Sequence, residues 1–107
     1  MLRHSAALDP NDNPGGFLQV SGVSYQIAGR ELAAASVGGE PIQPERVYRV
    51  VVPDFLAAGG DGYDELARMS DEVMTGRIIS DMLVDAIRTS KTPLAPRPDG
   101  RIQRATP

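Results

Sequence analysis

The chain has 107 residues, enough for one small domain, with 11 basic and 14 acidic side chains and a formal net charge of −3. This balance, with no basic stripe between aromatic residues, argues against a nucleic-acid partner. The absence of cysteine excludes disulfides and thiolate-bound metals. No apolar run approaches the roughly 20 residues that span a bilayer, and residues 1–10 do not form a secretory signal. We therefore expect a soluble chain with no membrane partner, which could be a piece of a larger protein.

The first half of the sequence predicts strands separated by turns. Residues 9–16 consist of turn formers and backbone breakers and predict an irregular loop. Residues 17–27 predict a long strand, whose apolar face switches at Gly22 and so indicates a bulge or twist there. A turn at 28–31 leads to a weaker, alanine-rich strand at about 32–37.

A third strand is predicted at about 47–53. This run is dense in β-branched residues with little alternation, which is typical of a central strand covered on both faces. Pro53 cannot donate a hydrogen bond to a β-ladder and should end the strand.

The second half of the sequence predicts helices and a final strand. Residues 64–69 could form a short helix, and 75–89 predict a longer one with a continuous apolar stripe. Several prolines after residue 92 predict an extended connector, and 101–104 predict a short last strand. This order of elements predicts an α+β fold, in which a mixed β-sheet packs against helices.

The residue inventory contains no hydrolytic centre. Such a metal centre needs several converging His and carboxylate ligands, whereas the chain has one histidine, His4, in a segment expected to be frayed. Residues 9–13 resemble a calcium loop, but Val20 stands where a bidentate Glu is required. The chain has no cysteine and no serine with a plausible base near it in sequence. We expect no catalytic residue, metal or cofactor in this chain.

The glycine-rich stretch GGDG at 59–62 has two interpretations. Its glycines could simply supply the positive φ of a tight turn around Asp61. A phosphate-binding P-loop is excluded, because no Gly-Lys-Ser/Thr follows. Alternatively, the ring of Phe55 and the carboxylate of Asp61 could hold an amphipathic ring compound, by stacking and by accepting hydrogen bonds from a vicinal diol. Tyr63 could equally pack the turn or touch such a ligand.

Three stretches together resemble a known family: GGFLQVSGVSY (15–25), ERVYRVVVPDFLAAGGDGYDEL (45–66) and DGRIQR (99–104). In this order and spacing they are similar to the C-terminal domain of the 5′-nucleotidases, which include bacterial UDP-sugar hydrolases and surface ecto-5′-nucleotidases. The resemblance implies that residues 14–107 form a partial C-terminal domain. Residues 1–13 would be an N-terminal extension or the remnant of an upstream helix.

The resemblance also implies a binding site. In this family the C-terminal domain binds the nucleotide, and a separate metallophosphoesterase domain with two metal ions cleaves it. Phe55 would be one of two aromatic residues that sandwich the base, and Asp61 would hold the ribose hydroxyls. The glycines that would let the backbone approach the ligand are Gly59, Gly60 and Gly62.

The family segments Asn-Gly-Gly-x-Ile-Arg and Leu-Pro-Phe-Gly, which supply phosphate-binding residues and the second stacking aromatic, have no counterpart here. Divalent metal ions are expected only in the absent catalytic domain. We expect the nucleoside- or nucleotide-recognition portion of a 5′-nucleotidase-type phosphohydrolase, inactive alone and binding nucleotide weakly. The family is mostly periplasmic, secreted or surface-attached.

Two alternatives remain open. The chain could be a folded remnant or oligomerising module without a specific ligand, or part of a cyclic-nucleotide, UDP-sugar or thiosulfonate hydrolase. The missing segments would leave an apolar face or edge bare, which predicts a homo-oligomer or pairing with the missing part of the family's domain.

Overall fold

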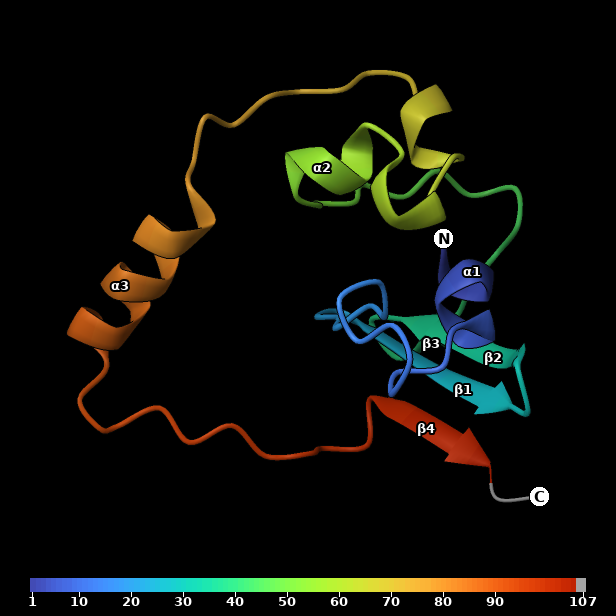
Figure 1. Cartoon of the computed structure of the whole chain (residues 1–107), viewed down its shortest axis with the longest axis horizontal. Coiled ribbons are helices and arrows are strands. Elements are labelled where there is room, and N and C mark those ends of the chain that lie inside the picture. The colour runs from blue at the N-terminus through green and yellow to red at the C-terminus, as the bar shows by residue number, and fades with distance from the viewer. Residues whose placement is uncertain (106–107) are drawn as a thin grey trace.

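The computed structural model describes residues 1–105 and contains a mixed four-stranded sheet in the order β3-β2-β1-β4 (Figure 1). The strands β1 (Val23–Ala28), β2 (Glu31–Val37) and β3 (Glu40–Pro41) follow one another as antiparallel neighbours. The last strand, β4 (Ile102–Ala105), returns from the far end of the chain and pairs parallel with β1. This mixed sheet with its helices confirms the predicted α+β class.

The β1–β2 hairpin follows from its turn. Gly29 opens the turn with a φ of 62°, in the left-handed region that favours glycine. Along β1 the side chains alternate, so that Tyr25 and Ile27 are buried on one face while Ser24, Gln26 and Ala28 are exposed. The predicted turn at 28–31 and the strand beside it are confirmed, because β2 begins within one residue of the expected position.

The strand predicted over 17–27 is wrong in its first half, because β1 begins only at Val23. Gly22 has a φ of 74°, and this left-handed residue separates the strand from the preceding segment. Phe17 lies outside the sheet and packs on the core, with its ring 6.5 Å from that of Tyr25. The switch of the apolar face at Gly22 therefore marks a break in the strand rather than a bulge within it.

Helix α1 (Leu2–Ala7) covers the buried face of the sheet (Figure 1). Ser5 of this helix is fully buried, and its Oγ accepts a hydrogen bond from the Leu18 backbone N–H at 2.9 Å. The same Oγ lies 3.2 Å from the Tyr25 hydroxyl, which donates to the Leu18 carbonyl at 3.0 Å. The segment predicted to be frayed is thus part of the core, and that prediction is wrong. The core cluster contains Leu2, Ala6, Tyr25 and Ile27.

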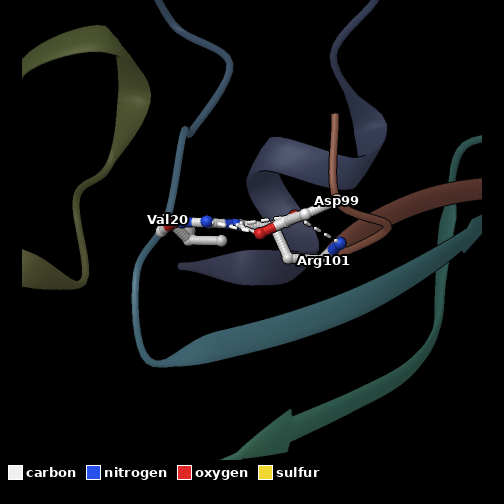
Figure 2. A network of polar contacts seen from close by, with 3 residues as sticks. All are labelled: Val20, Asp99 and Arg101. Atoms are coloured by element: carbon white, nitrogen blue, oxygen red, sulfur yellow. Dashed lines mark hydrogen bonds and ion pairs between the residues drawn. The ribbon is translucent and has the colours of Figure 1, made fainter. Parts of the chain in front are cut away.

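A polar network holds the start of β4 against the loop before β1, as Figure 2 shows. The Arg101 guanidinium donates to the Asp99 carboxylate from Nε at 2.9 Å, and to the Val20 carbonyl from Nη1 at 2.8 Å. The Arg101 carbonyl in turn accepts from the Tyr25 N–H at 2.8 Å. Hydrogen bonds from Arg101 hold the pKa of Asp99 at about 2. Arg101 thus connects the start of β4 to β1 and to the loop before it, about 80 residues earlier in the chain.

The strand predicted at about 47–53 is also wrong, because residues 43–53 contain no regular element. Val47 and Val51 are 92% and 91% exposed, whereas a central strand would bury both. The edge strand β3 is only two residues long and ends at Pro41, which has no N–H to donate. Within residues 1–105 no other strand lies beside this run, so its β-branched residues form no ladder.

Helix α3 (Ile79–Thr89) confirms the predicted helix but starts four residues later than expected. Gly76 adopts a φ of 68°, which breaks helical geometry, and the Thr75 hydroxyl accepts from the Arg77 N–H instead of capping the helix. Figure 1 shows α3 on long extended arms, apart from the sheet. Its apolar stripe is uncovered, because each of these side chains is at least 45% exposed: Ile78, Ile79, Met82, Leu83 and Ile87.

Candidate functional site

The segment after Pro53 folds into one helical turn and two tight turns on the far side of α1 from the sheet (Figure 1). These are α2 (Asp54–Ala57) and the 3₁₀ turns η1 (Gly60–Gly62) and η2 (Leu66–Arg68). The short helix predicted at 64–69 appears only as η2. The segment contacts α1 through His4 and the loop before β1 through Gly16, so the sheet positions it indirectly.

Phe55 lies on α2 with its ring against the η1 turn and is 60% exposed. A Cβ placed on Gly60 would lie within 2.5 Å of the Phe55 Cε1 atom, so only glycine lets the ring approach the backbone this closely. A large aromatic surface is thereby held in place and still open to solvent. Such a surface is what a planar ring compound needs for stacking.

Asp61 is at the tip of η1 in a left-handed conformation, with φ 55° and ψ 25°. Gly59 and Gly62, on either side of the tip, also have positive φ angles, of 93° and 80°. The Asp61 residue is exposed, and no group within residues 1–105 forms a hydrogen bond to its carboxylate. The turn thus presents an unpaired carboxylate one residue from the glycine on which the Phe55 ring lies.

Tyr63 is 1% exposed and belongs to the interior of this segment. Its hydroxyl donates to the Gly16 carbonyl at 2.6 Å, and its ring meets that of His4 edge to face at a centroid distance of 4.5 Å. Burial raises the pKa of the Tyr63 phenol above its usual value. Tyr63 thus packs the inside of the turn, which is one of the two roles that the sequence left open.

His4 and Gly16 are the residues that sequence reasoning missed. The His4 Nε2 donates to the Asp61 carbonyl at 2.7 Å, and the Gly16 carbonyl accepts from Tyr63. The spacing of Leu2 and Ala6 could have indicated that residues 2–7 form a packed helix. The distant contact between His4 and the glycine turn has no counterpart in the local pattern.

The arrangement offers one aromatic wall and one carboxylate, and no second aromatic ring faces Phe55 among residues 1–105. A depression of about 400 Å³ lined by Asp9, Arg30 and Arg104 shares no residue with this segment. Within the same range no three His, Asp or Glu side chains gather where they could hold a metal ion. None of the helices within residues 1–105 is long and apolar enough to cross a membrane.

Comparison with known proteins relates the chain to one family. A family model described as the C-terminal domain of 5′-nucleotidase matches residues 1–68. A 5′-nucleotidase of Vibrio cholerae is 32% identical over 84 residues, covering 78% of this chain and 15% of that protein. Protein UshA of Escherichia coli is 31% identical over 80% of the chain and 16% of its own length. A 5′-nucleotidase-related protein of Glossina morsitans morsitans is 34% identical, covering 94% of the chain and 20% of that protein.

The chain thus spans a fifth or less of the length of these relatives. No solved structure matches it significantly. The family match includes α1, the hairpin and the whole segment from α2 to η2. The chain therefore belongs to the 5′-nucleotidase C-terminal domain family, of which it forms a partial domain.

Proposed function

We propose that this chain is the nucleoside-recognising portion of a 5′-nucleotidase-type hydrolase. The observation that carries the proposal is the pairing of an exposed Phe55 ring with the unpaired carboxylate of Asp61 on one glycine-opened turn. A nucleoside presents the complementary groups, a planar base for stacking and a vicinal diol that donates hydrogen bonds. The printed names of two relatives, the 5′-nucleotidases of Vibrio cholerae and Vibrio vulnificus, support a nucleotide as the class of ligand.

Each residue has a separate role in this proposal. Phe55 stacks on one face of the base, and the Asp61 carboxylate accepts hydrogen bonds from the two ribose hydroxyls. Gly60 and Gly62 have no side chains, so the Phe55 ring can lie against the turn at Gly60 and the His4 ring at Gly62. We assign no catalytic step to this chain and propose that the divalent metal ions of the family are held by its separate catalytic domain.

Binding should be weak, because one stacking face contributes about 1–3 kcal/mol per base. Association costs at least several kcal/mol in lost translational and rotational freedom. With one aromatic wall and one carboxylate, we expect a dissociation constant for AMP in the range of about 1 mM or weaker.

An NMR titration of the ¹⁵N-labelled chain with AMP tests the proposal. We expect fast-exchange shifts of the amides between Phe55 and Tyr63, and loss of these shifts in both Phe55→Ala and Asp61→Ala. Asp64→Ala, a carboxylate change outside the η1 turn, is the matched control and should titrate as the wild type. Shifts that survive both Phe55→Ala and Asp61→Ala would show that these residues do not recognise the nucleoside.

A second candidate function is self-association, favoured by the amount of exposed surface. The chain exposes 8,750 Å², whereas a compact monomer of 11.4 kDa exposes about 5,800 Å². An interface that covered this excess of about 3,000 Å² on each of two copies would bury about 6,000 Å² in total, at the upper end of the range of obligate homodimer interfaces. Because the uncovered apolar stripe of α3 contributes to this excess, we propose that a second copy of this chain covers it.

A further inference from the structure

We infer that His4 is a positioning residue, whose imidazole holds the backbone of the η1 turn and so sets the direction of the Asp61 carboxylate. The inference deepens the proposed function and rests on it for the role of Asp61. It concerns α1, a helix that lies outside the glycine-rich segment to which the family motif points.

His4 is on the side of α1 that faces away from the sheet. At 3.6 residues per turn, position 4 lies about 200° around the helix from positions 2 and 6, whose side chains are buried in the core. Packing of Leu2 and Ala6 against the sheet therefore fixes the direction in which the imidazole points. That direction leads to η1, as the contacts of the ring show.

The imidazole touches three consecutive residues of the turn. Its Nε2 lies 2.7 Å from the Asp61 carbonyl oxygen, and its ring meets Tyr63 at an interplanar angle of 80°. A Cβ on Gly62 would lie only 2.8 Å from the His4 Cε1, so the missing side chain at Gly62 leaves the space that the imidazole fills. Since a carbonyl can only accept, Nε2 must carry the proton.

The Asp61 backbone needs such support. A non-glycine residue with φ 55° is in a sparsely populated region and persists there only when its surroundings hold it. The carboxylate of Asp61 does not supply this support, because nothing within residues 1–105 bonds to it. The supports of the turn are the Tyr63 N–H, which donates to the Gly60 carbonyl at 3.1 Å, the Tyr63 hydroxyl on Gly16, and His4.

Two substitutions separate the hydrogen bond from the packing of the ring. His4→Phe keeps an aromatic ring against Tyr63 but has no donor, whereas His4→Gln restores an N–H donor at a similar distance from the backbone. Arg3→Gln, at the exposed neighbouring position of α1, is the matched control. Urea unfolding of each variant shows that the domain is intact before the turn is measured.

The first measurement needs no ligand. We expect the imidazole ¹⁵N spectrum of the wild type at neutral pH to show the Nε2–H tautomer. Amide hydrogen exchange across residues 60–63 should be about 3- to 10-fold faster in His4→Phe and near wild type in His4→Gln and Arg3→Gln. An Nδ1–H tautomer, or equal exchange in wild type and His4→Phe, would refute the inference.

The second measurement is the AMP titration of the same variants. We expect His4→Phe to bind AMP about 3- to 10-fold more weakly and His4→Gln to recover most of the affinity. Wild-type affinity in His4→Phe, with loss of binding in Asp61→Ala, would contradict the positioning role while leaving the proposed function standing. If AMP shifts survive Asp61→Ala, the proposed function fails instead, and the tautomer and exchange results still decide whether His4 holds the turn.

Discussion

Replacing Tyr25 by alanine is expected to unfold the domain at room temperature. Tyr25 is 1% exposed, lies at the centre of β1, and contacts both the helix and the loop that cover the sheet. Truncating a buried aromatic residue costs about 3–5 kcal/mol, which is a large share of the total stability of a small domain. Far-UV circular dichroism during urea titration should show either no transition or a midpoint far below that of the wild type.

Tyr25→Phe is the matched control, because it keeps the ring and removes only the hydroxyl. The Leu18 carbonyl then loses the hydrogen bond that it accepts from Tyr25, and Ser5 loses a partner for its own hydroxyl. We expect a loss of about 1–3 kcal/mol in the free energy of unfolding, with the fold retained. If Tyr25→Ala unfolded at the wild-type urea concentration, Tyr25 would not be central to the core.

The second large effect is expected on self-association. The double substitution Ile79→Glu with Leu83→Glu places two carboxylates on the apolar stripe of α3, at positions one helical turn apart. If a second copy covers this stripe, burying the new charges should weaken the dimer at least about 100-fold, because an unpaired buried charge costs several kcal/mol. Sedimentation equilibrium at several concentrations should show a wild-type dimer and a monomeric variant.

Asp81→Asn with Asp85→Asn, a double change on the polar face of the same helix, is the control and should leave the dimer intact. Neither pair should alter the sheet, because α3 stands apart from it (Figure 1). A wild-type chain that sediments as a monomer at high concentration would rule out the second copy. Equal association of wild type and Ile79→Glu/Leu83→Glu would place the contact elsewhere.

The parts of the fold that could be predicted are those in which local chemistry decides the structure. The hairpin follows from a glycine at the turn and alternating side chains in β1, and α3 follows from apolar residues at helical spacing. The segment at 47–53 was mispredicted because β-branched residues favour a strand only where a neighbouring strand is present. The strand predicted from residue 17 begins only at Val23, because a glycine in the left-handed region can interrupt a strand as well as form a bulge within it.

The site shows the same division. The exposed ring of Phe55 and the turn around Asp61 could be expected from the glycine spacing and the family motif. Their support could not, because it comes from residues about 50 positions away: His4 bonds to the Asp61 carbonyl across 57 residues, and Tyr63 to Gly16 across 47. Such contacts depend on how α1 packs on the sheet, which no local pattern encodes.

The central claim is that Phe55 stacks on a nucleobase while Asp61 holds the ribose. The most direct test is a two-dimensional NOE measurement on the chain saturated with AMP. We predict cross peaks between the Phe55 ring protons and the adenine H2 and H8 protons, and between the ribose protons and the amides of residues 60–62. Cross peaks from adenine to another part of the surface, with none to Phe55, would contradict the account.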